Sequence, residues 1–332
     1  MSHGVKRTRE AADVLAARRE KERSKLQAYL ELTDDVVARK RAAVFTQECF
    51  DLTTKLLGLN PELSSVWNYR RLILLNALFP NLSPEGTFSL LQSELNFTTG
   101  ALKQYPKTYW IWNHRRWCLA KVPPGPEGAP VEKSWKRQVW ARELFIVERM
   151  LDADARNFHA WNYRRYVLAS DPGLRSPEDE LAYTKKKIEA SFSNFSAWHQ
   201  RSKVYSALWE EGVSEDEVRQ VKDAEFELVQ QALYTDPGDQ SAWLYHRWLI
   251  GNGDDTAVLK REIANIEELL AIEPDSKWCL ESLVHYKRLL AARSQPDEAA
   301  QLSDLKKECN TMLSKLQTID PKRKARYQEL VL

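Results

Sequence analysis

Hydrophobic positions along the chain form a repeat that is anchored on tryptophan. After five of these tryptophans a second apolar or aromatic residue follows seven positions later, which is the spacing of a buried stripe on a helix. Neighbouring tryptophans are 45, 49, 37, 45 and 35 residues apart, so each interval has room for two helices and their turns. The repeats are centred on Trp67, Trp112, Trp161, Trp198 and Trp243, with a degenerate copy at Trp278.

This pattern predicts an all-α chain. Glycine is rare, with 11 in 332 residues, and runs of good helix formers are long. One helical hairpin cannot bury its own apolar face, so we expect the hairpins to stack into a solenoid. The proline-rich stretch at 122–130 is predicted to be a loop inside a single domain, 1–332. The ends, 1–45 and 290–332, are expected to be helices that cap the array.

Paired arginines follow the first three tryptophans, three and four positions on, and flank the predicted core stripe. A guanidinium group so close to a core needs a carboxylate or carbonyl partner, or must face a cleft. The pairs either lock neighbouring hairpins together or contact a partner chain, and the spacing leaves both interpretations open. They are Arg70 and Arg71, Arg115 and Arg116, and Arg164 and Arg165.

Composition narrows the class of protein. Lys+Arg 49 against Asp+Glu 47 leaves a net charge of +2, which gives no field directed at nucleic acid. Four cysteines without a C-x-x-C pair predict reduced thiols, as in the cytoplasm. No apolar signal segment or membrane-spanning run is present, so stable membrane insertion is not expected. Phosphate-binding loops, zinc-site spacings and nucleophile motifs are also missing from the sequence.

Two neighbouring repeats differ from the others just before the tryptophan. Only these two carry a cation five residues before it, Lys107 and Arg156, and both also carry an aromatic residue three before it. If adjacent turns hold these cations at helix N-termini, the two turns form an anion site suited to phosphate or diphosphate. Asn157 and His159 add hydrogen-bond donors there. The alternative is that both cations are solvent-exposed turn residues.

The repeat P-x-x-x-x-x-W-N-x-R-R resembles that of protein prenyltransferase α subunits. The segments at 154–165, 192–202 and 236–248 look most like the Rab geranylgeranyltransferase (type II) branch, in its shorter fungal form. This resemblance implies a crescent-shaped, right-handed superhelix of hairpins around a β subunit. It implies an enzyme that moves geranylgeranyl from its diphosphate to C-terminal cysteines of Rab GTPases, presented by an escort protein.

The resemblance also implies roles for residues. The β subunit would hold the zinc, so no cofactor is expected on this chain, and geranylgeranyl diphosphate would be the substrate. Lys107 would stabilise the leaving diphosphate, and four residues would bind substrate: Tyr109, Arg156, Asn157 and His159. Phe158 departs from the farnesyl-type pattern because it lacks the hydroxyl of tyrosine. The expected partner interface consists of Trp112, Asn113, Arg115, Arg116, Trp161, Asn162, Arg164, Arg165, Trp198 and Arg201.

Two further expectations concern partners. The escort protein is expected on the later repeats, around 175–260, and His3 is a candidate ligand of the β subunit's zinc.

Two other functions remain open. One alternative is a non-catalytic helical-repeat scaffold. The other is the α subunit of farnesyltransferase or type I geranylgeranyltransferase.

Overall fold

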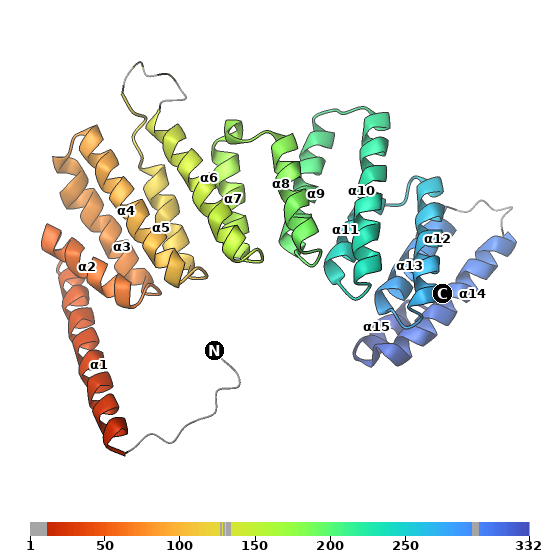
Figure 1. The fold of residues 1–332 in the computed structure, drawn as a ribbon, viewed down its shortest axis with the longest axis horizontal. Coiled ribbons are helices and arrows are strands. Elements are labelled where there is room, and N and C mark those ends of the chain that lie inside the picture. Colours follow the sequence, from red (N-terminus) through yellow and green to blue (C-terminus); the bar gives the residue numbers. More distant parts are fainter. Residues whose placement is uncertain (1–11, 127, 129, 131–133, 294–298, 332) are drawn as a thin grey trace. The chain divides into compact units, whose positions relative to one another are not determined.

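The structure is a computed structural model that describes residues 12–126, 128, 130, 134–293 and 299–331. Within these residues the chain is built of helices and has no strand, as predicted. Figure 1 shows the helices running alternately up and down along the sequence. The described helices are not long and apolar enough for any of them to cross a membrane.

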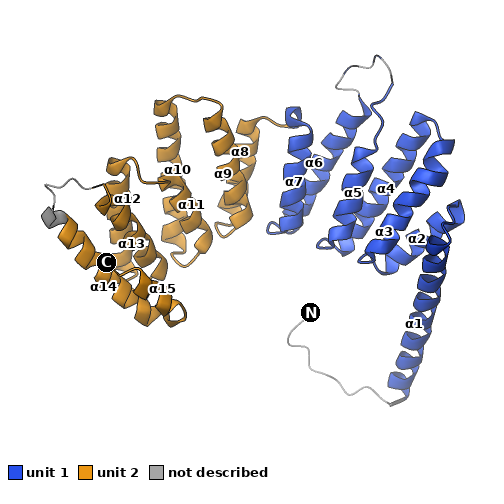
Figure 2. Ribbon diagram, turned by 180° about the vertical axis from the view of Figure 1, so that it is seen from behind, with its two compact units in different colours: residues 1–174 blue, residues 175–332 orange. Residues whose placement is uncertain are grey.

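The chain divides into two compact units, Met1–Leu174 and Arg175–Leu332, coloured separately in Figure 2. Unit 1 contains α1 (Ala12–Arg41), α2 (Gln47–Leu59), α3 (Ser64–Ile73), α4 (Pro84–Gln104), α5 (Tyr109–Ala120), α6 (Trp135–Ala153) and α7 (Phe158–Ser170). Unit 2 contains α8 (Pro177–Ala190), α9 (Phe195–Glu210), α10 (Glu215–Thr235), α11 (Gln240–Ile250), α12 (Thr256–Ile272), α13 (Lys277–Ala291), α14 (Ala299–Ile319) and α15 (Lys324–Glu329). The hairpins are α2/α3, α4/α5, α6/α7, α8/α9, α10/α11 and α12/α13.

Each tryptophan of the repeat is buried and holds the turn that precedes it. In the first five repeats the indole Nε1 donates a hydrogen bond to the backbone carbonyl six residues earlier, at 2.6 to 3.0 Å. The acceptors are the carbonyls of Pro61, Pro106, Ala155, Phe192 and Pro237. Four residues separate the two helices of every hairpin. The constant distance between proline and tryptophan in the sequence therefore reflects one hydrogen bond that closes a turn of fixed length.

The first arginine of the first two pairs, Arg70 or Arg115, links two successive hairpins. Arg115 on α5 makes two hydrogen bonds to the carboxylate of Glu143 on α6, at 2.5 and 2.7 Å. Its remaining nitrogen, Nη1, donates to the carbonyl of Leu95 on α4. Tyr163 on α7 donates to the same glutamate. We call this arrangement a glutamate node: a buried glutamate that receives an arginine from one repeat and a polar residue from the next.

Glutamate nodes occur in both units. Glu94 accepts from Arg70 and is bonded to His114, while Glu225 accepts from Arg201 and Tyr245. All of these side chains are buried, and their charges and donors are matched within the node, which satisfies the condition for burying ions. The prediction that the arginines lock neighbouring hairpins is confirmed for Arg70 and Arg115, whereas Arg164 pairs with Glu148 on α6 of its own hairpin.

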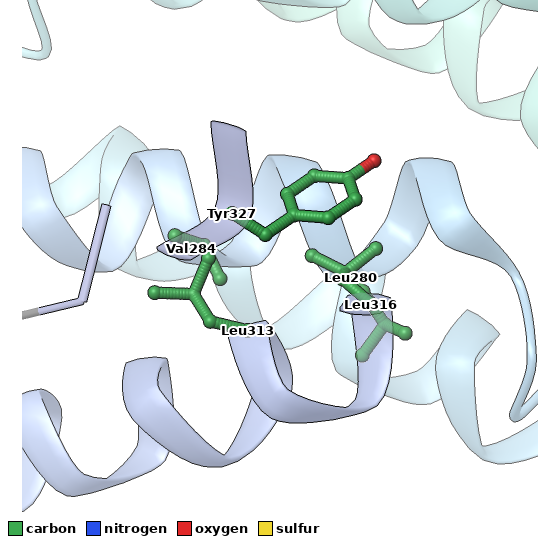
Figure 3. Close-up of a cluster of buried hydrophobic side chains, with 5 residues drawn as sticks. All are labelled: Leu280, Val284, Leu313, Leu316 and Tyr327. Carbon is green, nitrogen blue, oxygen red and sulfur yellow. The ribbon is translucent and has the colours of Figure 1, made fainter. Parts of the chain in front are cut away.

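The C-terminal end of unit 2 is closed by α14 and α15, which pack on α13. Figure 3 shows the apolar cluster that joins them, with Tyr327 lying over side chains of α13 and α14. The cluster consists of Leu280, Val284, Leu313, Leu316 and Tyr327. The prediction of helical ends is confirmed where the structure describes them, by α1 at one end and by α14 and α15 at the other.

Candidate functional site

Two neighbouring turns of unit 1, at 105–108 and 154–157, lead into α5 and α7 and are joined directly. Nδ2 of Asn157 donates to the carbonyl of Pro106 at 3.2 Å. Nζ of Lys107 lies 3.5 Å from Oδ2 of Asp154. The turns that carry the two predicted cations, Lys107 and Arg156, are therefore adjacent, as the proposed anion site requires.

Asn157 is the N-cap of α7 and is only 2% exposed. Its Oδ1 accepts from the backbone N–H groups of His159 and Ala160, while its Nδ2 binds the carbonyl of Pro106. Both ends of the amide are thus occupied by the protein. The structure makes Asn157 a brace between the two turns, and its predicted contact with substrate stays a prediction.

Lys107 and Arg156 are both exposed, and the Lys107 side chain retains 69% of its accessible surface. Lys107 lies two residues before the first residue of α5 and Arg156 two residues before that of α7, where the helix dipole favours an anion. The two cations thus lie at the positive ends of neighbouring helices.

Asp154 is a neighbour of Lys107 that the sequence pattern did not indicate. Its Oδ1 accepts the backbone N–H of Arg156, and its Oδ2 faces Lys107. Asn60 and Asp236 occupy the same position in other repeats, and each likewise accepts the backbone N–H two residues on. The signal for the turn was therefore present in the repeat, but the pairing with Lys107 depends on which turns are neighbours.

An aromatic cluster lies at the start of α5 and α7. The ring of His159 is 4.3 Å from that of Tyr109 and 4.0 Å from that of Phe158, measured between centroids. Tyr109 and Phe158 are 58% and 55% exposed, whereas His159 is buried. Burial lowers the pKa of His159, and the charge of Lys107 lowers it further. The imidazole is therefore neutral at pH 7 and keeps one donor and one acceptor.

An apolar groove of about 410 Å³ adjoins these turns on the side of α4 and α6. Leu102, Phe145 and Met150 line it, together with Pro106 and Asn157 of the two turns. Nothing in the sequence pattern indicated this groove, because its lining comes from two helices whose neighbourhood only the fold defines. It provides apolar surface next to the cations.

The residues expected at a partner interface fall into two groups. Six are buried inside this chain, with exposures of 5% or less, which contradicts a direct interface role for their side chains: Trp112, Arg115, Trp161, Arg164, Trp198 and Arg201. The tryptophans close turns, and Arg115, Arg164 and Arg201 pair with glutamates of neighbouring helices. The remaining four are exposed or half-buried and stay candidates: Asn113, Arg116, Asn162 and Arg165.

One cluster of unit 1 has the side chains of a metal site. The ligand atoms of Glu94, His114 and Cys118 lie within 4.8 Å of one another, and all three residues are buried. However, the carboxylate oxygens of Glu94 are occupied by Arg70 and His114, and burial raises the pKa of the Cys118 thiol well above its usual value. The cluster is better explained as a glutamate node. His3, the predicted zinc ligand, lies outside the described residues.

The fold and the site together define a repeat protein of α-helical hairpins with a cationic pair of turns in its first unit. The model for the "Protein prenyltransferase alpha subunit repeat" matches residues 46–77, 91–122, 140–171, 177–208 and 222–253. These matches coincide with the five hairpins whose tryptophans close their turns.

Full-length relatives give the same result. The chain is 36% identical to "Geranylgeranyl transferase type-2 subunit alpha" of Schizosaccharomyces pombe, over 99% of this chain and 97% of that one. It is 32% identical to the protein of the same name from Saccharomyces cerevisiae, over 99% and 98%. A chain of the Candida albicans protein geranylgeranyltransferase-I complexed with GGPP shares the fold, with a TM-score of 0.68, 20% identity and coverage of 92% and 90%. The chain belongs to the protein prenyltransferase α-subunit family.

Proposed function

We propose that the chain is the α subunit of a type-2 geranylgeranyl transferase. In this proposal it transfers geranylgeranyl from geranylgeranyl diphosphate to C-terminal cysteines of Rab GTPases presented by an escort protein. It acts in the cytoplasm, as one domain, and only together with a β subunit that holds the zinc and the lipid. The observation that carries the proposal is the similarity over 99% of the chain to two fungal proteins with that name.

The proposed chemistry gives Lys107 a defined task. As the allylic C–O bond breaks, negative charge grows on the departing diphosphate. An ammonium group that lies beside it stabilises the transition state more than the ground state, which raises the rate of transfer. In the free chain Lys107 faces Asp154, an exposed pair worth little in energy, so a diphosphate with more charge displaces the carboxylate easily.

Neighbouring residues complete the proposed site. Arg156 approaches from the next turn, and the neutral His159 can donate a hydrogen bond to a phosphate oxygen. Tyr109 supplies an exposed ring and hydroxyl at the same helix N-terminus. Phe158 has no hydroxyl, so in this proposal it contributes apolar surface only.

The test is single-turnover transfer by the heterodimer with a Rab substrate and its escort. Lys107→Ala is expected to lower the transfer rate by about tenfold to a thousandfold, with a smaller effect on the affinity for geranylgeranyl diphosphate. Lys55→Ala, at an exposed lysine of α2 away from the two turns, is the control and should leave the rate within about twofold. An unchanged rate for Lys107→Ala would remove this residue from the mechanism.

The same assay separates the alternative functions. Transfer to a C-a-a-X peptide without an escort would indicate a farnesyl-type or type I enzyme. A chain that binds a β subunit but supports transfer to neither substrate would be a scaffold, and the proposal would fail.

A further inference from the structure

A small cavity of about 260 Å³ lies in unit 2, where α11, α13, α14 and α15 meet. Part of its wall is apolar and belongs to the cluster of Figure 3, with Val284 on α13 and Leu313 and Leu316 on α14. Leu330, which follows α15, continues this wall. The rest of the lining is polar and comes from α11, α13 and α15. The cavity therefore places charged groups beside an apolar surface.

Three arginines from three different helices line this cavity, which we call the arginine pocket: Arg247 on α11, Arg288 on α13 and Arg326 on α15. Among the described residues, none of the three has a salt-bridge partner. Arg323, a neighbour in the sequence, pairs with Glu281 instead. In the glutamate nodes, likewise, each arginine has a carboxylate. The arginine pocket thus holds cations that the described part of the fold leaves unmatched.

The three arginines also have donors to spare. Nε of Arg247 is buried and has no hydrogen-bond partner in the described chain, although the side chain approaches the hydroxyl of Tyr286. Arg288 is half-buried and donates from Nη1 to the carbonyl of Leu330 at 2.7 Å, which leaves most of its N–H groups available. Arg326 is exposed, and its side chain makes no hydrogen bond to a described residue. All three guanidinium groups therefore keep N–H donors for a ligand.

Glu281 is the one acidic residue in the lining, and its carboxylate is already occupied. It accepts from the hydroxyl of Tyr327 at 2.5 Å and from Nη1 of Arg323 at 3.2 Å. Three guanidinium groups and one carboxylate leave the lining with two positive charges in excess. Like charges that share one small cavity repel each other, and an anion that enters the cavity removes this cost.

His285 lies in the same lining, beside the arginines. Burial lowers its pKa, and the charges of Arg247 and Arg288 lower it further, so both guanidinium groups act on one imidazole. The ring is therefore neutral at pH 7 and offers a hydrogen bond without adding charge. Cations from α11 and α13 thus converge on one side of the cavity.

The chemistry of the lining favours a phosphate monoester over a carboxylate. A phosphate monoester carries about 1.5 to 2 negative charges at pH 7 and three acceptor oxygens, so it matches the excess of positive charge, whereas a carboxylate carries only one charge. Guanidinium groups bind phosphate oxygens through paired N–H donors. The cavity is a little smaller than the roughly 300–1,000 Å³ of pockets for drug-sized ligands, so the organic part must be small and lies on the apolar wall.

We infer that the arginine pocket binds a small organic phosphate monoester. Arg247, Arg288 and Arg326 hold the phosphate group, and the apolar wall with Val284 and Leu316 contacts the organic group. The pocket belongs to unit 2, whereas the candidate diphosphate site belongs to unit 1. It is therefore a second ligand site, and it goes beyond the proposed function, which gives it no role.

The test titrates the full chain with phenyl phosphate and follows the heat of binding. One molecule should bind in the pocket and raise the melting temperature of the chain, because the ligand binds the folded state. Benzoate, which has one charge and two oxygens, should bind at least about tenfold more weakly. Equal affinity for benzoate would contradict the assignment to a phosphate.

Two substitutions remove the cations one at a time. Arg326→Ala changes an exposed residue, so the core stays intact, and Arg247→Met keeps an unbranched side chain. Each should weaken the binding of phenyl phosphate by about tenfold to a hundredfold, because each removes a charge-assisted contact. Lys324→Ala, at an exposed lysine of α15 outside the lining, is the matched control and should stay within about twofold of wild type.

Three further results would overturn the inference. One is the absence of saturable binding at millimolar phenyl phosphate. Another is an equal loss of affinity in Arg326→Ala and Lys324→Ala, which would reflect attraction to the surface charge in general. The third is binding that is lost in Lys107→Ala but kept in Arg326→Ala, which would place the ligand at the turns of unit 1. The proposed transfer of geranylgeranyl is judged separately, in the heterodimer.

Discussion

The two units use the same means to hold their hairpins together, but they differ at the positions one and four residues after the tryptophan. In both units, tryptophan closes the four-residue turn and a buried glutamate joins successive repeats. In unit 1 the two positions hold asparagine and arginine in all three repeats, whereas in unit 2 they hold His199 and Ser202, Leu244 and Arg247, and Cys279 and Ser282. The shared features maintain the fold in both units.

The two units also differ in the residue that pairs with the buried glutamate of each node. The nodes at Glu94 and Glu143 in unit 1, and at Glu225 in unit 2, receive an arginine from the preceding repeat. The node at Glu262 receives His246 in that position. A guanidinium group keeps its charge when it is buried, whereas an imidazole can become neutral, so loss of the glutamate should have unequal consequences.

The largest expected effect comes from removing the node glutamates. Glu143→Ala leaves Arg115 buried without a counter-charge and should lower the free energy of unfolding by about 3–5 kcal/mol. Glu225→Ala should cost a similar amount, and Glu262→Ala less, about 1–3 kcal/mol, because its buried partner is the histidine His246 and not an arginine. Urea unfolding of the full chain, followed by tryptophan fluorescence, measures all three. Equal losses would show that the identity of the cation does not matter.

A smaller effect concerns pH and the node at Glu94. Burial lowers the pKa of His114, so the unfolded chain binds a proton that the folded chain does not as pH falls below about 6.5. Unfolding should therefore become easier from pH 7 to pH 5.5, by up to about 1.4 kcal/mol per pH unit. His114→Gln should remove the part of this dependence that comes from His114, because Gln200 occupies the same repeat position and donates to Glu180 without titrating. If His114→Gln retained the full pH dependence of the free energy of unfolding, that dependence would come from other groups.

At lower pH the same node should weaken further. Burial alone would raise the pKa of Glu94, but hydrogen bonds from Arg70 and His114 outweigh it and lower the pKa to about 2. Its contribution to stability is therefore complete above the unfolded value, near pH 4.5, and is lost as pH falls toward 2. This loss should persist in His114→Gln, since Arg70 remains.

The smallest expected effect is the difference in stability lost when two helix N-caps are removed. Asn157→Ala removes the N-cap of α7 and also the bond to Pro106, whereas Ser214→Ala removes only the capping box of α10. Ser214→Ala should cost about 1 kcal/mol, and Asn157→Ala about 1 kcal/mol more because of the additional hydrogen bond. Thermal unfolding of the two variants side by side measures the difference. Equal costs would mean that the bond between the turns adds nothing to stability.

The sequence predicted the hairpins well because their signal is local. The tryptophan and the carbonyl that it binds are six residues apart, and the apolar stripe repeats within one helix. The distinction between the two arginines could not be predicted, since their partners have no fixed spacing. Glu94 lies 24 residues after Arg70, whereas Glu143 lies 28 after Arg115. Packing decides which arginine of a pair meets a glutamate, and for this reason the sequence left open whether the pairs lock hairpins or contact a partner chain.

The candidate site could be predicted only in part, because some of its contacts also join residues that are far apart in the sequence. Lys107 and Arg156 stood out because the other repeats lack a cation at that position. The contacts of Asp154 with Lys107, and of Asn157 with Pro106, join residues 47 and 51 positions apart and follow from the stacking of whole hairpins. The roles of these residues in catalysis stay predictions until transfer is measured.

The fixed length of the tryptophan turn limits where the chain can accept inserted residues. All six tryptophan turns have four residues, while the links between one hairpin and the next range from four residues, between α9 and α10, to 14, between α5 and α6. Insertions thus gather at one end of the hairpins, and the end with Lys107 keeps its geometry. A foreign peptide or a fluorescent tag placed in the α5–α6 link should therefore be tolerated, whereas one added residue at 105–108 should not.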